Sequence, residues 1–230
     1  MFIFKLPAGS GNMLFIMKRG HIMRTLKRNL SLITIGMVLL FWGCGGPRLM
    51  MPTPNVYLNE EQDPYHALNP DLKSTEVRLF YVTDRGPEQD KEGNLRYGYN
   101  RSASMAFGDV VVDLGVNHTW EDLLHASRTQ KRLKPVKLKL GKITEHIRGP
   151  KTPLPYAMVD GKIVEEPSWV AQSKQAAEAF RTELVQQLAL TPRKEIFLYI
   201  HGFHNTFDDA AFAMAELWHF LGRIGVPMIY

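Results

Sequence analysis

The sequence predicts an α/β fold: a mostly parallel sheet with an N-terminal β extension. Ile196–Ile200 is a continuous apolar run rich in β-branched and aromatic residues, which is typical of a strand buried on both faces. His201–Gly202 ends this run, and Thr206 then supplies a hydroxyl N-cap for a new helix. Strand patterns dominate the middle of the chain and strand–helix alternation its C-terminal part, which together favour this fold class.

Strands are expected before helices along the chain, with a Pro-rich break between them. The predicted elements are strands at Val77–Val82, Ser104–Leu114 and Lys137–Leu140, a hairpin at Met158–Val164, helices over 168–188 and 207–224, and a strand that begins at Met228. Thr83–Asp84–Arg85 is expected to stop the first strand. The long helix should present Ala177, Phe180, Leu184 and Leu188 on one face, and the last helix Ala211, Met214, Trp218 and Leu221.

The basic excess of the chain belongs to its N-terminal segment. The formal net charge is +5, but residues 1–44 hold six basic residues and no acid. The remainder has 22 basic and 23 acidic residues, so no nucleic-acid partner is predicted. A local basic run from Arg128 to Lys139 is interpreted as a solvated face, the alternative being a patch for phosphate or anionic lipid.

The segment 1–44 has the organisation of an export signal, in which residues 1–22 are a mis-assigned start. Basic residues 24, 27 and 28 precede the apolar stretch Leu30–Trp42, whose 13 residues are short for a permanent membrane span. The stretch ends at Gly43–Cys44, and Cys44 is the single cysteine of the chain, so no intramolecular disulfide can form. Residues 45–76, rich in Pro, Asn and Asp, are expected to form a tether to a domain over 77–230.

This arrangement resembles a bacterial lipoprotein signal. The resemblance implies that Cys44 is acylated and becomes the mature N-terminus, which places the protein in the bacterial cell envelope with the membrane as its partner. Gly45, in place of an acidic residue after the cysteine, favours the outer membrane. The alternatives are an uncleaved N-terminal membrane anchor and a chance apolar segment.

His201–Gly202 is the strongest candidate for a functional site. A glycine after a strand lets the backbone approach a ligand closely, and a loop that leads into a helix N-terminus offers backbone N–H groups. The alternative is structural, with a histidine that only bonds a neighbouring loop. Asp84 and Arg85 are candidates for substrate contact or for a structural ion pair.

Several motifs occur in one order: VRLFYVTDR at Val77–Arg85, Tyr97–Gly98 with Arg101, Phe107–Gly108, His118, and HGFHNTFDDAA at His201–Ala211. Together they resemble a bacterial family of α/β-hydrolase-like proteins of uncharacterised function, often labelled esterase/lipase superfamily enzymes, many of them lipoproteins. The resemblance implies an incomplete α/β-hydrolase-type fold and a serine esterase acting on an ester or acyl substrate. The implied oxyanion-hole candidates are His201, Gly202, Phe203 and His204, and His118 has a substrate or structural role. His204 stands where the pattern has Asn.

A catalytic nucleophile is missing from this pattern. No G-x-S-x-G occurs in the 230 residues, so a truncated product without serine-hydrolase activity is expected, and a non-enzymatic envelope lipoprotein is the alternative. No cofactor is predicted. No metal site is predicted either, because the groups His118, Glu121, Asp122 and His125, and His201 with His204, lack a second ligand cluster at zinc spacing.

Overall fold

The computed structural model describes residues 46–55, 63–129, 131–153 and 156–230. The predicted signal segment with Cys44, and residues 56–62 of the predicted tether, lie outside the described residues. Residues Pro47–Tyr230 form the compact unit that holds all the elements below. In the described part of the chain no helix has the length and apolar character needed to cross a membrane.

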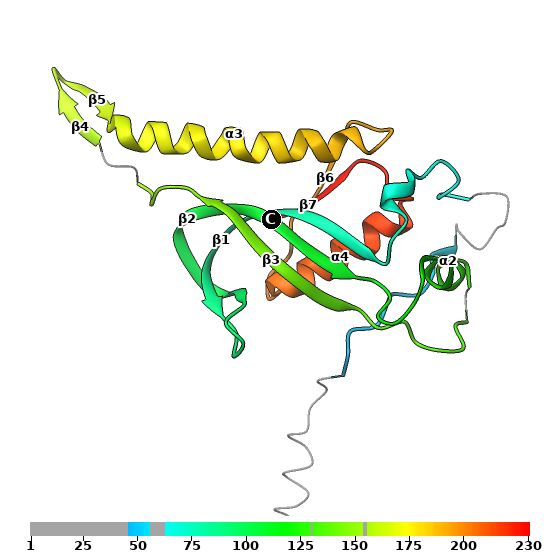
Figure 1. The fold of residues 1–230 in the computed structure, drawn as a ribbon. Coiled ribbons are helices and arrows are strands. Elements are labelled where there is room, and N and C mark those ends of the chain that lie inside the picture. The colour runs from blue at the N-terminus through cyan, green and yellow to red at the C-terminus, as the bar shows by residue number, and fades with distance from the viewer. Residues whose placement is uncertain (1–45, 56–62, 130, 154–155) are drawn as a thin grey trace, which may run out of the picture. The chain divides into compact units, whose positions relative to one another are not determined.

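A five-stranded mixed sheet forms the centre of the domain (Figure 1). Its strand order is β3-β2-β1-β7-β6, in which the β1–β2 and β2–β3 pairs are antiparallel and the β1–β7 and β7–β6 pairs are parallel. The strands are β1 Glu76–Gln89, β2 Leu95–Asp113, β3 Lys139–Arg148, β6 Ile196–Tyr199 and β7 Val226–Ile229. The α/β class with an N-terminal β extension is therefore confirmed.

The β1–β2 hairpin is longer than the sequence predicts. Thr83–Asp84–Arg85 does not end β1, which continues to Gln89 through register shifts between Thr83 and Arg85 and between Arg85 and Pro87. These bulges accommodate the polar residues and the proline inside the strand. Tyr81 pairs with Ile229 near the end of β7, so the later part of β1 extends beyond the carboxyl ends of the parallel strands.

Two helices cover opposite faces of the sheet (Figure 1). Helix α4, Phe207–Phe220, packs its buried residues with Leu79 and Tyr81 in the main core, where the predicted face residues Ala211, Met214 and Trp218 are buried and Leu221 is exposed. Helix α3, Pro167–Ala189, packs Phe180, Leu184 and Leu188 against a small cluster of Phe80, Val226 and Met228. Because neighbouring strand residues point to opposite faces, Phe80 contacts α3 while Leu79 and Tyr81 contact the α4 side.

The predicted tether needs correction. Met50, Tyr65, Leu68 and Leu72 are buried in the main core, and Pro70–Leu72 forms a short 3₁₀ helix. The compact domain therefore begins near Pro47 rather than at Val77. No periodic pattern marks this segment in the sequence, since irregular backbone buries single apolar side chains at uneven spacing.

Strand β6 is not buried on both faces. It lies at the edge of the sheet, and Ile196 and Leu198 are 44% and 52% exposed, while Phe197 and Tyr199 pack against the main core. Helix α3 packs on Phe80 of β1 and on Val226 and Met228 of β7, and Ile196 and Leu198 of β6 stay exposed. On α3 itself, Ala176 is buried in place of the predicted Ala177.

The remaining elements complete the domain. Helix α2, Trp120–Arg128, buries Leu123 beside the main core. The predicted hairpin is present as β4, Tyr156–Val159, and β5, Lys162–Glu165. Asp160 and Gly161 at its turn both have positive φ, as a two-residue hairpin turn of this kind requires.

The small α3 cluster predicts a local dependence of stability on Phe180. The change Phe180→Ala should lower the free energy of unfolding by about 2 kcal/mol, because it removes a half-buried ring that packs on Phe80 and Phe107. The matched control Val185→Ala, at an exposed position of the same helix, should change it by less than about 0.5 kcal/mol. Urea unfolding measures both, and equal effects of the two substitutions would contradict this packing.

Candidate functional site

The loop between β6 and α4, residues 201–205, lies at the carboxyl end of the parallel strands. His201 N–H donates to Tyr230 O at 3.3 Å, which joins the loop to the end of β7. Asn205 N–H donates to Gly202 O at 3.5 Å, and His204 has a φ of 67°. This combination is that of a type II turn, in which the third residue takes positive φ. Ligand sites of α/β sheets commonly lie at this edge.

Three consecutive backbone N–H groups of this loop are unpaired. Those of Gly202, Phe203 and His204 donate to no acceptor within the residues that the structure describes. The loop is open to solvent, and the Phe203 side chain is 94% exposed. An anion or a polarised carbonyl oxygen is the ligand that such donors suit.

Helix α4 begins at this loop with a complete capping box. Thr206 Oγ1 accepts from Asp209 N–H at 3.0 Å, and Asp209 Oδ2 accepts from Thr206 N–H at 3.2 Å. These bonds from Thr206 hold the pKa of the Asp209 carboxyl below its usual value, although burial opposes them. The predicted N-cap is confirmed, and it fixes the direction in which the chain leaves the loop.

Arg85 joins the β1–β2 hairpin to the loop. Its side chain is buried, and it donates to Gly98 O at 2.8 Å and to Asn205 O at 2.7 Å. It also lies 3.3 Å from His201 Nε2, while His201 Nδ1 lies 3.0 Å from Gly202 O. Since the carbonyl can only accept, these contacts fit a proton on Nδ1 and leave Nε2 to accept from Arg85.

Two cavities meet at Arg85 and Tyr99. The larger, about 430 Å³, is lined by Arg85, Tyr99, Arg101, His201, Gly202, Phe203, His204 and Asn205. The smaller, about 270 Å³, is lined by Arg85, Arg96, Tyr97, Gly98, Tyr99, Thr206 and Asp208. Burial raises the pKa of the Asp208 carboxyl, against the opposing charge of Arg96. We call the larger cavity the loop cleft.

Most of the predicted site residues lie around the loop cleft, and His118 does not. Asp84 forms an ion pair with Arg101 rather than with its neighbour Arg85. His118 precedes α2, and its Nδ1 contacts Val116 O at 2.9 Å. In the described residues no group of His, Cys, Asp and Glu is arranged to hold a metal ion.

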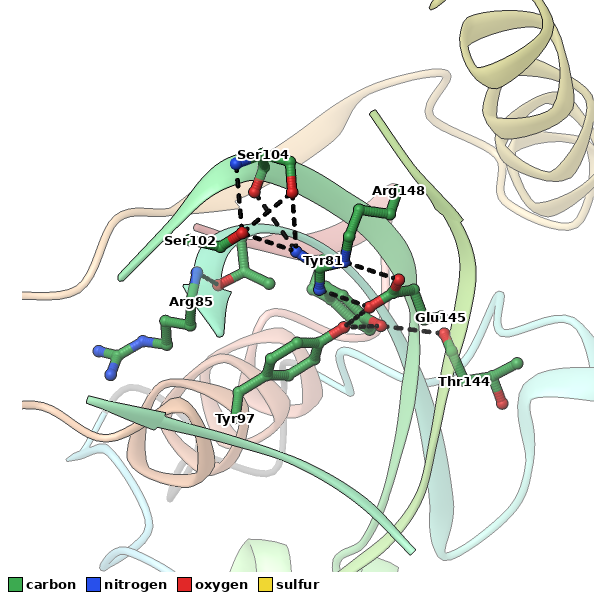
Figure 2. Close-up of polar contacts among 9 residues, drawn as sticks. Tyr81, Arg85, Tyr97, Ser102, Ser104, Thr144, Glu145 and Arg148 are labelled. Atoms are coloured by element: carbon green, nitrogen blue, oxygen red, sulfur yellow. Dashed lines mark hydrogen bonds and ion pairs between the residues drawn. The ribbon is translucent and has the colours of Figure 1, made fainter. Parts of the chain in front are cut away.

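A buried polar network that the sequence analysis did not predict lies beside the smaller cavity (Figure 2). The hydroxyls of Tyr81 and Tyr97 lie 2.9 Å apart, Tyr97 donates to Glu145 at 2.6 Å, and Arg148 pairs with the same carboxylate at 2.6 Å. Burial raises the pKa of both tyrosines, so they stay neutral donors. The network crosses β1, β2 and β3, whose register the sequence alone does not reveal.

A buried serine–histidine pair lies elsewhere, between α2 and α4. Ser127 Oγ lies 2.7 Å from His219 Nε2, and Arg223 Nε–H donates to His219 Nδ1 at 3.2 Å. Nδ1 therefore accepts, and a neutral ring places its proton on Nε2, toward the serine. Burial, and then Arg223, lower the pKa of His219, while Ser127 donates to Leu123 O at 2.7 Å. The pair is structural, because the histidine cannot remove a proton from this serine.

The part of the chain that contains the loop matches a known protein family. Residues 176–230 match the model of a family described as alpha/beta hydrolase of unknown function (DUF900). This region is therefore similar to that family. It holds most of α3, all of β6, α4 and β7, and the complete loop. No curated protein and no solved structure matches the chain significantly.

The positive φ of His204 predicts that glycine is better tolerated there. The change His204→Gly should raise the free energy of unfolding by about 0.5–1 kcal/mol, because left-handed backbone is strained for residues with a Cβ. Phe203→Gly, at an exposed neighbour without positive φ, should give no gain. Thermal unfolding compares the two, and a stabilisation by Phe203→Gly alone would contradict the turn.

Proposed function

We propose that residues 201–205 form the oxyanion loop of an α/β-hydrolase-type protein that acts on a carboxylic ester or related acyl bond. The N–H groups of Phe203 and His204 would donate to the carbonyl oxygen of the acyl group. The observation that carries this proposal is the row of unpaired N–H groups beside an open cleft. The family match over residues 176–230 supports it.

The loop is held in place before any ligand binds. Arg85 fixes it through Asn205 O, the turn fixes Gly202 against Asn205, and the capping box fixes the start of α4. Donors that are already oriented lose little free energy to reorganisation when negative charge develops on the carbonyl oxygen. In hydrolases, loss of one such donor typically costs about 10²–10³ in rate.

The chemistry proposed for this chain is binding and polarisation of the carbonyl. The 230 residues contain no G-x-S-x-G, and Ser127 is excluded as a nucleophile by the direction of the His219 proton. Attack on the carbonyl therefore requires a serine, a base and an acid that these residues do not supply. Without them, oriented donors bind the acyl group with little turnover.

The proposal predicts that a backbone N–H at position 203 binds a tetrahedral oxyanion. Phe203→Pro removes this N–H while keeping the backbone, because proline is favoured at the second position of a type II turn. Methylphosphonate should bind the variant about tenfold more weakly, since one charge-assisted hydrogen bond is lost. Titration followed by NMR measures the affinity. Phe203→Ala is the matched control and should bind as the unaltered chain does; equal affinity of all three proteins would refute the donor role.

The second candidate function is a non-enzymatic envelope lipoprotein that binds a partner or envelope component. The missing nucleophile elbow in the sequence is the observation that favours it. Reaction of the protein from its native membrane with a fluorophosphonate separates the two candidates, because the probe modifies only an activated serine.

We also propose that Cys44 is lipidated and anchors the protein in the bacterial envelope, with the outer membrane favoured. The sequence signal at residues 23–44 carries this proposal. In a bacterial host, labelled palmitate should be incorporated and the protein should sediment with membranes, whereas Cys44→Ser should abolish incorporation. Membrane association without incorporation would instead support an uncleaved N-terminal anchor.

A further inference from the structure

The loop cleft has the charge of an anion site. Its eight lining residues include two arginines and two histidines and no aspartate or glutamate. We propose that the acyl ligand of this cleft carries a negatively charged group, a carboxylate or a phosphate, that Arg85 and Arg101 bind. This inference rests on the proposed function for its acyl part, and on the arginines for its anionic part.

The charge of Arg85 is not balanced by any carboxylate in the described part of the chain. Its partners are the carbonyl oxygens of Gly98 and Asn205 and a ring nitrogen of His201, which satisfy hydrogen bonds and leave the positive charge. A buried charge without a counterion is costly, and an anion in the adjoining cleft would offset that cost.

Arg85 and Arg101 are also direct cross-strand partners in the β1–β2 hairpin. Like charges that face each other across an antiparallel pair repel and lower stability. Asp84 neutralises part of this repulsion through its ion pair with Arg101, whose side chain is still 68% exposed. The pair of guanidinium groups thus has one carboxylate, which bonds Arg101 alone, and an anionic ligand would supply the second negative charge.

Two exposed aromatic side chains complete the cleft. Tyr99 is 64% exposed, with the Arg85 guanidinium carbon 5.8 Å from its ring centre, and the loop residue Phe203 is 94% exposed. They add apolar surface to a cleft that the arginines and the loop also line. The neighbouring cavity differs, since Asp208 lines it and its Arg96 is paired with Asp90 at 3.1 Å. The anion site is therefore assigned to the loop cleft alone.

Monomethyl succinate and dimethyl succinate test this inference, because they differ by one negative charge and both present an ester carbonyl. NMR titration of the whole chain should show the monoester binding about tenfold more tightly, with an affinity that falls as salt is added. Arg101→Gln should remove this preference. Arg181→Gln makes the same charge change at an exposed position of α3 and should leave it intact.

Equal affinity for the two esters, or a preference that survives Arg101→Gln, would overturn the anion site and leave the acyl proposal standing. If succinate binds as tightly as its monoester and shifts no loop amide, the anion site holds and the acyl proposal fails. Methyl phosphate is a further probe that separates the two anion classes. If it binds more tightly than monomethyl succinate, the arginines prefer a phosphate; if it binds more weakly, they prefer a carboxylate. Failure of every probe to bind would overturn the inference.

Discussion

The contact of Arg85 with the loop is the interaction on which the site depends. One guanidinium group donates to the backbone of β2 at Gly98 and to the backbone of the loop at Asn205. It therefore links two segments that lie more than 100 positions apart in the sequence. The same group supplies positive charge to the loop cleft. A lysine would provide a similar charge, but it lacks the planar fork that reaches two carbonyls and a histidine together.

This contact exists because the β1–β2 hairpin extends beyond the carboxyl ends of the parallel strands. Strand β7 pairs with β1 only around Phe80 and Tyr81, and the bulged part of β1 continues past the end of β7. This extension places Arg85 at the edge of the sheet where β6 leads into the loop at His201–Gly202. The antiparallel extension therefore contributes one side of the cleft, and the region that matches the family model contributes the other.

Two buried polar clusters in this domain have a structural role. The tyrosine–glutamate–arginine network behind the smaller cavity pairs each charge with an opposite one, and Arg223 with His219 and Ser127 forms a buried cluster inside the main core. Both stabilise the packing of elements that are distant in sequence. The arginines of the loop cleft differ from both, since they line a cavity together with the exposed loop of residues 202–204.

Local patterns in the sequence determined the element types and the core of the site. The apolar run Ile196–Ile200, the glycine after it and the Thr206 cap predicted strand, loop and helix, because each depends on residues a few positions apart. The sequence also marked His201–His204, Asp84 and Arg85 as candidates. It misplaced the end of β1 and the burial of β6, since bulges and edge positions depend on which strands become neighbours.

Only the tertiary structure decided which of these residues act together. The pairing of Arg85 with Arg101, the bond from Arg85 to Asn205 and the exclusion of His118 all follow from strand order and register. The burial of Met50 and Tyr65 followed in the same way, from a core assembled by distant segments. The type of each element depends on residues that are close in the sequence. The position of a site between a bulged hairpin and a distant loop depends instead on how the strands pair and pack across the whole sheet.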